Sequence, residues 1–194
     1  MARKRVIDQQ AILDAAERVV GRSGAVNLTL DAVAAEAGIS KASVIYDYKS
    51  KQALIEAVVD RAFQRDNEHH AGIEAGLPEG PGPAIRGRIV AAAEPPPEAF
   101  RAVALNLSAA LTLDDALRSK MRANQAETIA RIRQTSPSER GALLAYLALE
   151  GLKFLEYLDF HHFARDERDR ILREINWLVT AVPEEADLLD TSSV

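Results

Sequence analysis

Residues 28–54 read LTLDAVAAEAGISKASVIYDYKSKQAL and contain two short helical patterns joined by a turn at residues 37–40. Thr29 is a favourable N-cap for the first helix, and Gly38 ends it because glycine adopts the left-handed conformation without a Cβ penalty. Ser40 then caps a second helix that begins at Lys41. This layout predicts a helix-turn-helix, in which the second helix enters the major groove of DNA.

The side chains of this segment have the chemistry that DNA binding requires. Lys41, Lys49 and Lys51 can reach phosphates, which gives an affinity that depends on salt. The small residues Ala42 and Ser43 allow the second helix to lie close to base edges. The predicted DNA-binding residues are Thr29, Lys41, Ala42, Ser43, Tyr46, Tyr48 and Lys51. The same spacing also fits an ordinary three-helix packing unit with solvated lysines.

A longer stretch, from Ile12 to Leu54, resembles the N-terminal domain of the TetR family of transcriptional repressors. The resemblance rests on IL at 12–13, AA at 15–16, Gly24, LTLDAVAAEAGIS at 28–40 and KASVIYDYKSK at 41–51. It implies a homodimer whose N-terminal domains read a palindromic operator. It also implies a C-terminal domain that binds a small molecule and then releases the DNA.

The resemblance assigns roles to individual residues. Thr29 matches a capping threonine that touches a phosphate, and Lys51 matches a lysine that contacts phosphate at the start of the fourth helix. Lys41, Ala42 and Ser43 begin the recognition helix, and Tyr46 matches an aromatic residue that contacts the DNA backbone or a thymine methyl group. The chain departs from the family at three positions. Ile45 stands where tyrosine is usual, Asp47 where histidine or tyrosine is common, and Tyr48 where phenylalanine is usual.

Composition and charge fit a DNA-binding protein with an acidic body. The chain has 194 residues, 47% of them apolar and only 5% aromatic, and its net charge is −5. Residues 1–51 hold eight basic and six acidic residues, a net charge of +2, whereas the remainder holds 16 and 23, a net charge of −7. Cysteine is absent, and no apolar run is long enough to span a membrane. We therefore expect a cytoplasmic protein that does not insert into membranes.

Helix and loop signals predict an all-α fold with an N-terminal helix-turn-helix domain at 1–50 and a helical domain at 51–183. The resemblance implies that this second domain binds the effector and forms the dimer. The acidic residues 184–194 are predicted to be a disordered tail. Helices are expected at 8–21, 51–70, 84–93, 99–112, 114–133, 138–158 and 166–182, with a loop at 76–83, where proline and glycine are frequent.

Two of these helices are candidates for self-association. The helix at 138–158 is apolar almost all round, so it must be buried on more than one side. The helix at 166–182 repeats apolar residues at spacings of four and three. The predicted dimer interface consists of Leu144, Ala148, Gly151, Leu155, Ile171, Ile175, Leu178 and Val182. A purely internal bundle core is the alternative.

A small, mostly apolar effector is expected between the 99–112 and 138–158 helices. The residues predicted to orient it are Asn106, Tyr146, Glu150, Phe154 and Tyr157. Alternatively, the aromatic residues fill the core, and Glu150 pairs with Lys153 or an arginine. The histidines occur as neighbours at 69–70 and 161–162, and neighbours on a helix point apart, so no metal site is predicted. No cofactor is expected either.

Phosphate-binding glycine loops and glycine-flanked serine nucleophiles are absent from the sequence, which argues against an enzyme. The sequence therefore predicts a ligand-responsive transcriptional regulator, a repressor that binds double-stranded DNA as a homodimer. Two alternatives remain open. One is a helical adaptor that kept the fold and lost operator binding, as Ile45 and Asp47 permit. The other is an architectural DNA-binding protein without a ligand.

Overall fold

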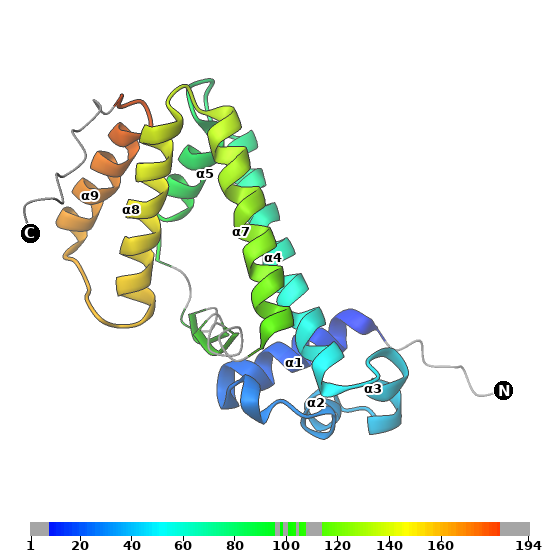
Figure 1. Ribbon diagram of the computed structural model, residues 1–194. Helices are drawn as coiled ribbons and strands as arrows, with labels where there is room; N and C mark the ends of the chain where they lie inside the picture. The colour runs from blue at the N-terminus through cyan, green and yellow to red at the C-terminus, as the bar shows by residue number, and fades with distance from the viewer. Residues whose placement is uncertain (1–7, 96–97, 99–100, 104, 108–113, 183–194) are drawn as a thin grey trace, which may run out of the picture. The chain divides into compact units, whose positions relative to one another are not determined.

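The computed structural model describes residues 8–95, 98, 101–103, 105–107 and 114–182, and within these ranges all regular structure is helical (Figure 1). The elements are α1 (Gln9–Ser23), a 3₁₀ turn η1 (Ala25–Asn27), α2 (Leu30–Ala37), α3 (Lys41–Asp47), α4 (Lys51–Ala75), α5 (Pro83–Ala91), α7 (Asp115–Thr135), α8 (Glu139–Tyr157) and α9 (Arg165–Leu178). None of the described helices has both the length and the apolar character required to cross a bilayer.

The residues form two compact units, each with its own hydrophobic core. The first unit comprises residues 1–67 and 96–124, and the second comprises residues 68–95 and 125–194. The boundary between the units does not coincide with the predicted one after Ser50, because Leu54 and Val58 of α4 lie in the core of the first unit. The functional division at residue 50 stays a prediction.

The core of the first unit is built by α1, α2, α3 and the first turns of α4. On α1, the apolar residues at helical spacing are all buried there, namely Ile12, Leu13, Ala16, Val19 and Val20. Leu28, Val33, Val44 and Leu54 are fully buried against them. Because α2, α3 and α4 each contribute side chains to this core, the core fixes the orientation of α2 and α3 relative to each other.

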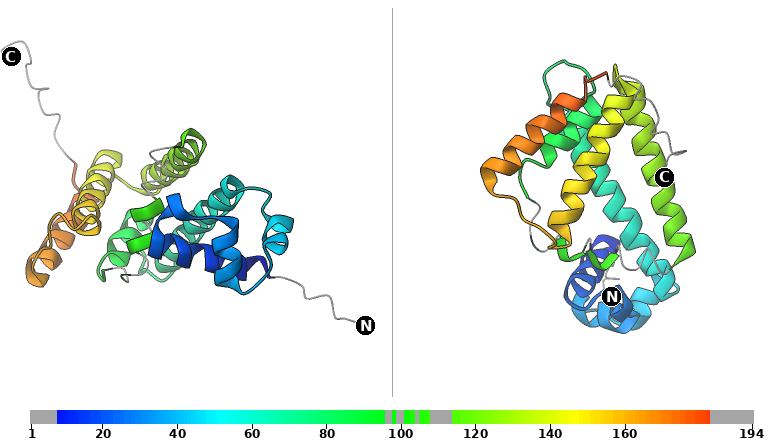
Figure 2. Two further views of the ribbon diagram at one scale, coloured as in Figure 1. Left: turned by 90° about the horizontal axis from the view of Figure 1, so that it is seen from below. Right: turned by 60° about the vertical axis from the view of Figure 1, so that its left-hand side comes forward.

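The second unit packs α5, α8 and α9 around a core that includes Ile85, Leu149 and Ile175. α8 and α9 lie side by side in every view (Figures 1 and 2). Gly141 near the start of α8 allows a close approach, since a Cβ there would collide with the carbonyl oxygens of Leu178 and Ala181. The hydroxyl of Ser138, the N-cap of α8, donates to the same Ala181 oxygen at 2.7 Å.

The predicted helix ends agree with the structure to within a few residues, with two larger differences. α4 continues to Ala75 instead of ending near His70, because the helix accommodates Gly72 and the chain first leaves it at Gly76 and Pro78. α9 ends at Leu178 instead of Val182, and a turn whose amide at Thr180 donates to the Trp177 oxygen follows it. Most of the predicted 99–112 helix and the predicted tail at 184–194 lie outside the described residues.

Candidate nucleic-acid interface

The caps predicted for the helix-turn-helix are present. The Thr29 hydroxyl accepts a hydrogen bond from the Ala32 amide at 3.0 Å. Gly38 has a φ of 66°, the left-handed conformation expected at the end of α2. The Ser40 hydroxyl accepts from the Ser43 amide at 3.1 Å and also lies 2.8 Å from the Ser43 hydroxyl. The turn between α2 and α3 is therefore set by local hydrogen bonds.

α3 has one buried face and one open face. Val44 is fully buried and anchors the helix to the first core, whereas the Tyr46 side chain, 77% exposed, lies on the open face. Lys41 and Ala42 are also exposed, and Ser43 is partly buried. The open face thus carries residues that can meet a DNA groove.

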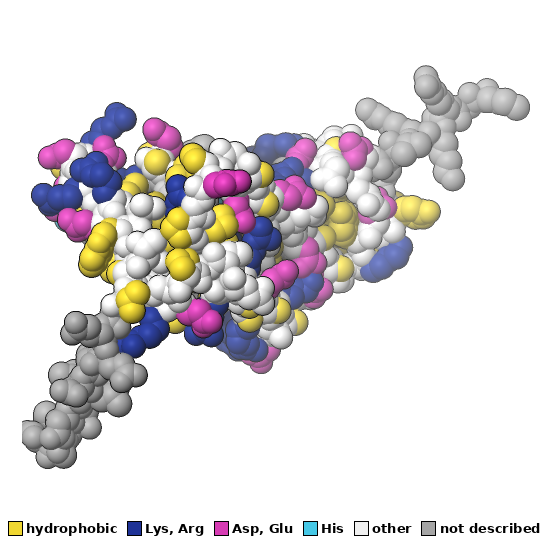
Figure 3. Space-filling view, turned by 90° about the horizontal axis from the view of Figure 1, so that it is seen from above, with side chains coloured by type: hydrophobic (Ala, Val, Ile, Leu, Met, Phe, Trp, Pro, Cys, Tyr) yellow, Lys and Arg dark blue, Asp and Glu magenta, His cyan; other side chains and the backbone are white. Residues whose placement is uncertain are grey.

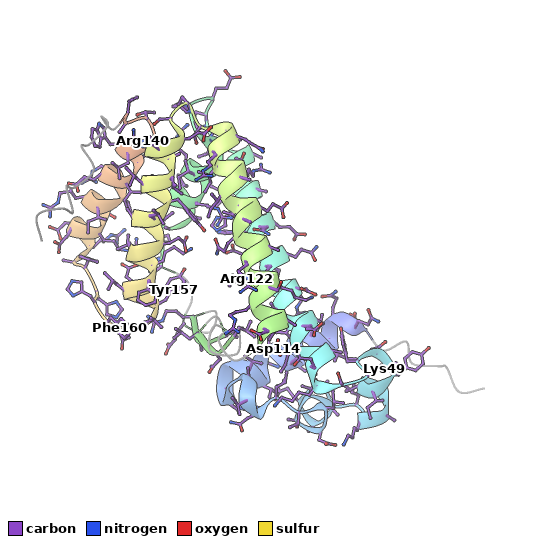
Figure 4. All side chains as sticks on the ribbon, in the orientation of Figure 1. Lys49, Asp114, Arg122, Arg140, Tyr157 and Phe160 are labelled. Carbon is purple, nitrogen blue, oxygen red and sulfur yellow. The ribbon has the colours of Figure 1, made fainter. Side chains whose placement is uncertain are left out.

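The lysines of this region are exposed but have partners within the chain. Lys41 Nζ lies 2.7 Å from the Asp31 carboxylate, and Lys51 Nζ donates to the carbonyl of Val26. Lys49, labelled in Figure 4, donates to the Tyr46 carbonyl at 2.6 Å, and its ammonium lies 5.3 Å from the centre of the Tyr46 ring. Each contact is at the surface, so a phosphate can replace it at little cost.

Two residues that depart from the family pattern are held by neighbours. Asp47 accepts a hydrogen bond from the Gln9 amide side chain at 3.0 Å, which ties the end of α3 to the start of α1. Tyr48 packs against the first core, and burial raises its pKa, with a smaller contribution from the Asp47 carboxylate. Tyr48 is therefore partly a packing residue, which the sequence alone did not indicate.

A buried arginine that was not predicted from the sequence joins α4 to α1. Arg61 is only 7% exposed, and its Nη1 donates to the Asp14 carboxylate at 2.8 Å. Its Nε donates to Glu17 at 2.9 Å. Arg65, one turn further along α4, reaches the same Glu17 from the surface at 3.1 Å. One signal in the sequence could have identified Arg61. It follows the apolar residues Val58 and Val59 at helical spacing, which places it on the inner face of α4.

A second ion pair joins α1 to α2. Arg18 Nε lies 2.7 Å and Arg22 Nη2 lies 3.0 Å from the Glu36 carboxylate, and these hydrogen bonds lower the pKa of Glu36. Glu36 therefore stabilises the folded state while it is ionised, and this contribution is lost as the pH falls through its lowered pKa.

We expect Glu36→Gln to lower the melting temperature at neutral pH, and we expect the difference from the native chain to close as the pH falls below about 4.3, the ordinary value for glutamate. Thermal unfolding followed by circular dichroism from about pH 3 to about pH 8 measures the difference in melting temperature on both sides of that pKa. Glu127→Gln, at an exposed position of α7, serves as the control. A difference that does not vary with pH would contradict the role given to this ion pair.

The predicted effector residues fall in both units. Asn106 belongs to the first unit and donates to the Ala102 carbonyl at 2.9 Å, whereas Tyr146, Glu150, Phe154 and Tyr157 belong to α8 in the second. Tyr146 is 4% exposed and hydrogen-bonds to Gln125. Glu150 pairs with Lys153 at 2.9 Å, which is the alternative that the sequence analysis left open.

Phe154 differs from the expectation of a residue inside a pocket. It is 57% exposed, and its ring lies edge-on to Phe160 with the centroids 5.8 Å apart. Tyr157 and Phe160 lie together at the C-terminal end of α8 (Figure 4). An effector role for these residues stays a prediction.

The residues predicted to form the dimer interface differ in exposure between α8 and α9. On α8, Leu144 is 45% exposed and Ala148 and Gly151 are also exposed, on the side away from the buried Ala145 and Leu149. On α9, Ile175 is 4% exposed and belongs to the core of its own unit, so for this residue the structure favours the internal alternative. The remaining interface residues are partly buried or exposed: Leu155, Ile171, Leu178 and Val182. Leu147 is also exposed on α8 and was not among the predicted interface residues.

No group of three or more His, Asp or Glu side chains able to hold a metal ion occurs within the described ranges. His161 stacks edge-on with Phe163, and His162 lies 2.5 Å from the Asp159 carboxylate. His69 and His70 lie next to each other on α4.

The fold and the capped turn define a helix-turn-helix protein, and matches to two family models identify its family. Residues 12–58 match the family described as bacterial regulatory proteins of the tetR family, and residues 82–180 match the tetracyclin repressor-like C-terminal domain. The chain belongs to the TetR family of transcription regulators. The family assignment confirms the expectation of a regulator instead of an enzyme.

Solved structures support the same fold. A TetR-family transcriptional regulator from Rhodococcus sp. aligns with a TM-score of 0.68 at 20% identity, over 88% of this chain and 97% of that chain. The multidrug binding protein EbrR in complex with imidazole aligns with a TM-score of 0.64 at 22% identity, over 95% and 99%. A transcriptional regulator from Saccharomonospora viridis in complex with choline aligns with a TM-score of 0.66 at 17% identity, over 88% and 94%. A search of curated sequences finds no significant match.

Proposed function

We propose that this protein is a ligand-responsive repressor that binds a palindromic operator as a homodimer and is released by a small, mostly apolar effector. The observation that carries the proposal is the open face of α3, which is anchored by the buried Val44 and carries exposed Lys41, Ala42 and Tyr46 beside a capped turn. We expect Thr29, the N-cap of α2, and Lys51, the first residue of α4, to contact phosphates.

Binding to the duplex requires Lys41 and Lys51 to exchange partners. In the free protein their ammonium groups contact Asp31 and the Val26 carbonyl. A phosphate oxygen offers each lysine a stronger partner, and the release of condensed counterions from DNA adds to the gain. The affinity should therefore fall steeply with added salt.

Selection of bound DNA from a random pool provides the operator with which to test the interface. We expect Lys51→Ala to weaken binding to all sequences alike and to reduce the slope of log affinity against log salt by about one. We expect Ser43→Ala to change the preferred sequence while the salt slope is kept.

Lys153→Ala removes the same charge from α8 and provides the matched control, which should bind DNA as the native chain does. If selection enriches no sequence and both Lys51→Ala and Ser43→Ala behave like the control, the adaptor alternative holds. If DNA binds without sequence preference, the architectural alternative holds.

The apolar side of α8 supports a dimer. Leu144 and Leu147 are exposed in the single chain, and a second copy is a partner that can cover them. Two recognition helices held roughly 34–36 Å apart, or a multiple of this, would enter successive major grooves on one face of the duplex.

We expect the native chain to sediment as a dimer at micromolar concentration and Leu144→Glu to sediment as a monomer, because a carboxylate would have to be buried without a partner. Val90→Glu is the matched control, since Val90 is 49% exposed on α5 against 45% for Leu144 on α8. Dissociation of both variants, or of neither, would contradict an interface on this side of α8.

The small-molecule complexes of the similar structures support an effector. EbrR is described in complex with imidazole and with malachite green, and the Saccharomonospora viridis regulator with choline. A ligand that binds better to the state without DNA shifts the equilibrium by its difference in affinity and by no more. Candidate effectors added to the DNA-binding assay should therefore lower the affinity for the operator to a limiting value.

A further inference from the structure

A polar hollow of about 470 Å³ opens in the second unit, between the loop after α4 and the C-terminal half of α9. These segments lie at the same end of the unit (Figure 1). The lining residues are Glu79, Gly80, Pro81, Arg86, Arg173, Asn176, Trp177, Val179 and Thr180. None of the residues predicted to orient the effector is among them.

The Arg86 guanidinium lies against the loop that lines this hollow. The group lies so close to the backbone of Gly80 that a Cβ at position 80 would collide with Nη1. Glycine at this position therefore leaves the space that the guanidinium occupies. The side chain of Arg86 is partly buried, which restricts its conformations before any ligand arrives.

Arg86 and Arg173 both line the hollow. Neither forms a hydrogen bond or an ion pair with the part of the chain that the structure describes. Other arginines of the same unit are paired, with Arg168 at 2.7 Å from Glu156 and Arg131 at 3.0 Å from Glu74. Two unpaired cations in one hollow favour the binding of an anion.

The balance of charge in the lining also favours an anion. Glu79 contributes one carboxylate, and the carbonyl end of α9 contributes a partial charge of about −0.5. The two guanidinium groups outweigh these together. The face seen in Figure 3 mixes basic, acidic and hydrophobic side chains, so selectivity would come from the hollow instead of from a generally basic surface.

The shapes of the donors indicate the class of ligand. Guanidinium groups present parallel N–H donors that match the oxygens of carboxylates and phosphates. The amide of Asn176 adds a donor, and the 67% exposed indole of Trp177 offers a flat surface for the rest of the molecule. We propose that this hollow is a second ligand site, in which Arg86 and Arg173 bind the carboxylate or phosphate group of a small molecule.

Trp177 is the single tryptophan of the chain and lies in the lining, so its fluorescence reports binding directly. The experiment titrates the full chain with citrate and with inorganic phosphate at constant ionic strength and follows Trp177 emission and heat. We expect a saturable change for at least one anion. Arg173→Ala and Arg86→Ala should each raise the dissociation constant at least tenfold, on the order expected for loss of one charged hydrogen bond.

Arg170→Ala is the matched control, because Arg170 is exposed on the same helix, pairs with Glu167 and does not line the hollow. It should bind as the native chain does. Gly80→Ala should weaken binding without removing a charge, since it displaces Arg86. A linear response without saturation, or equal titrations of the native chain and Arg173→Ala, would overturn the proposal.

The carboxylate can come from a free molecule or from the chain itself, which carries Glu184, Glu185, Asp187 and Asp190 after Val182. Neutralising these four residues to glutamine and asparagine distinguishes the sources. Tighter citrate binding by the neutralised chain would identify its own carboxylates as competitors for the same site. Unchanged binding would assign the site to free anions, and Arg173→Ala should weaken citrate binding in either case.

Discussion

Replacing Gly141 with alanine is expected to destabilise the second unit by about 3 kcal/mol or more, at the upper end of the usual range for overpacking. The added Cβ would collide with the carbonyl oxygens of Leu178 and Ala181, which are backbone atoms and cannot rotate away. α8 would have to move from the end of α9, and the 2.7 Å hydrogen bond from Ser138 to Ala181 would be lost with it. Urea unfolding followed by circular dichroism measures the change.

Gly151→Ala provides the control on the same helix. A Cβ at position 151 meets nothing within 4 Å, and alanine is favoured over glycine in a helix interior by roughly 0.5–1 kcal/mol. We therefore expect Gly151→Ala to be neutral or stabilising at the same protein concentration. If both variants lose stability to the same extent, the close approach of α8 and α9 is not the cause.

Truncation of Arg61 is expected to have the second largest effect, a loss of about 2–3 kcal/mol in the free energy of unfolding. Arg61→Ala removes charged hydrogen bonds to Asp14 and Glu17 and also the packing of a side chain that is only 7% exposed. Because α1 and α4 are joined by this group, the DNA affinity should fall as well. Chemical unfolding and a DNA-binding titration measure the two effects.

Arg65→Ala is the matched control, since Arg65 reaches the same carboxylates from a position that is 53% exposed. A surface ion pair contributes about 0–1 kcal/mol, so this variant should remain close to the native chain. Equal losses for Arg61→Ala and Arg65→Ala would mean that the total charge, and not the buried guanidinium, holds α1 against α4.

The parts of the fold that depend on neighbouring residues were predictable from the sequence. Thr29, Gly38 and Ser40 act within three or four residues of their own positions, so the turn between α2 and α3 could be derived from residue type alone. The buried face of α1 was predictable because helical periodicity places Ile12, Ala16 and Val19 on one side.

Contacts between distant residues were not predictable in the same way. Arg61 and Asp14 are 47 residues apart, and only the packing of α4 on α1 brings them together. The exposed Phe154 and the buried Ile175 differ from expectation for a related reason. An apolar residue on an amphipathic helix shows which face is apolar, but the fold decides whether the chain itself covers that face.

The first unit is not continuous along the chain, since residues 96–124 return to it after the second unit has begun. α7 accordingly supplies Leu117 to one core and Ile132 to the other. Engineers who wish to graft a new operator specificity onto this protein by a single crossover would leave Leu117 facing a foreign core. A working chimera therefore needs either two junctions or recoding of the open face of α3 alone.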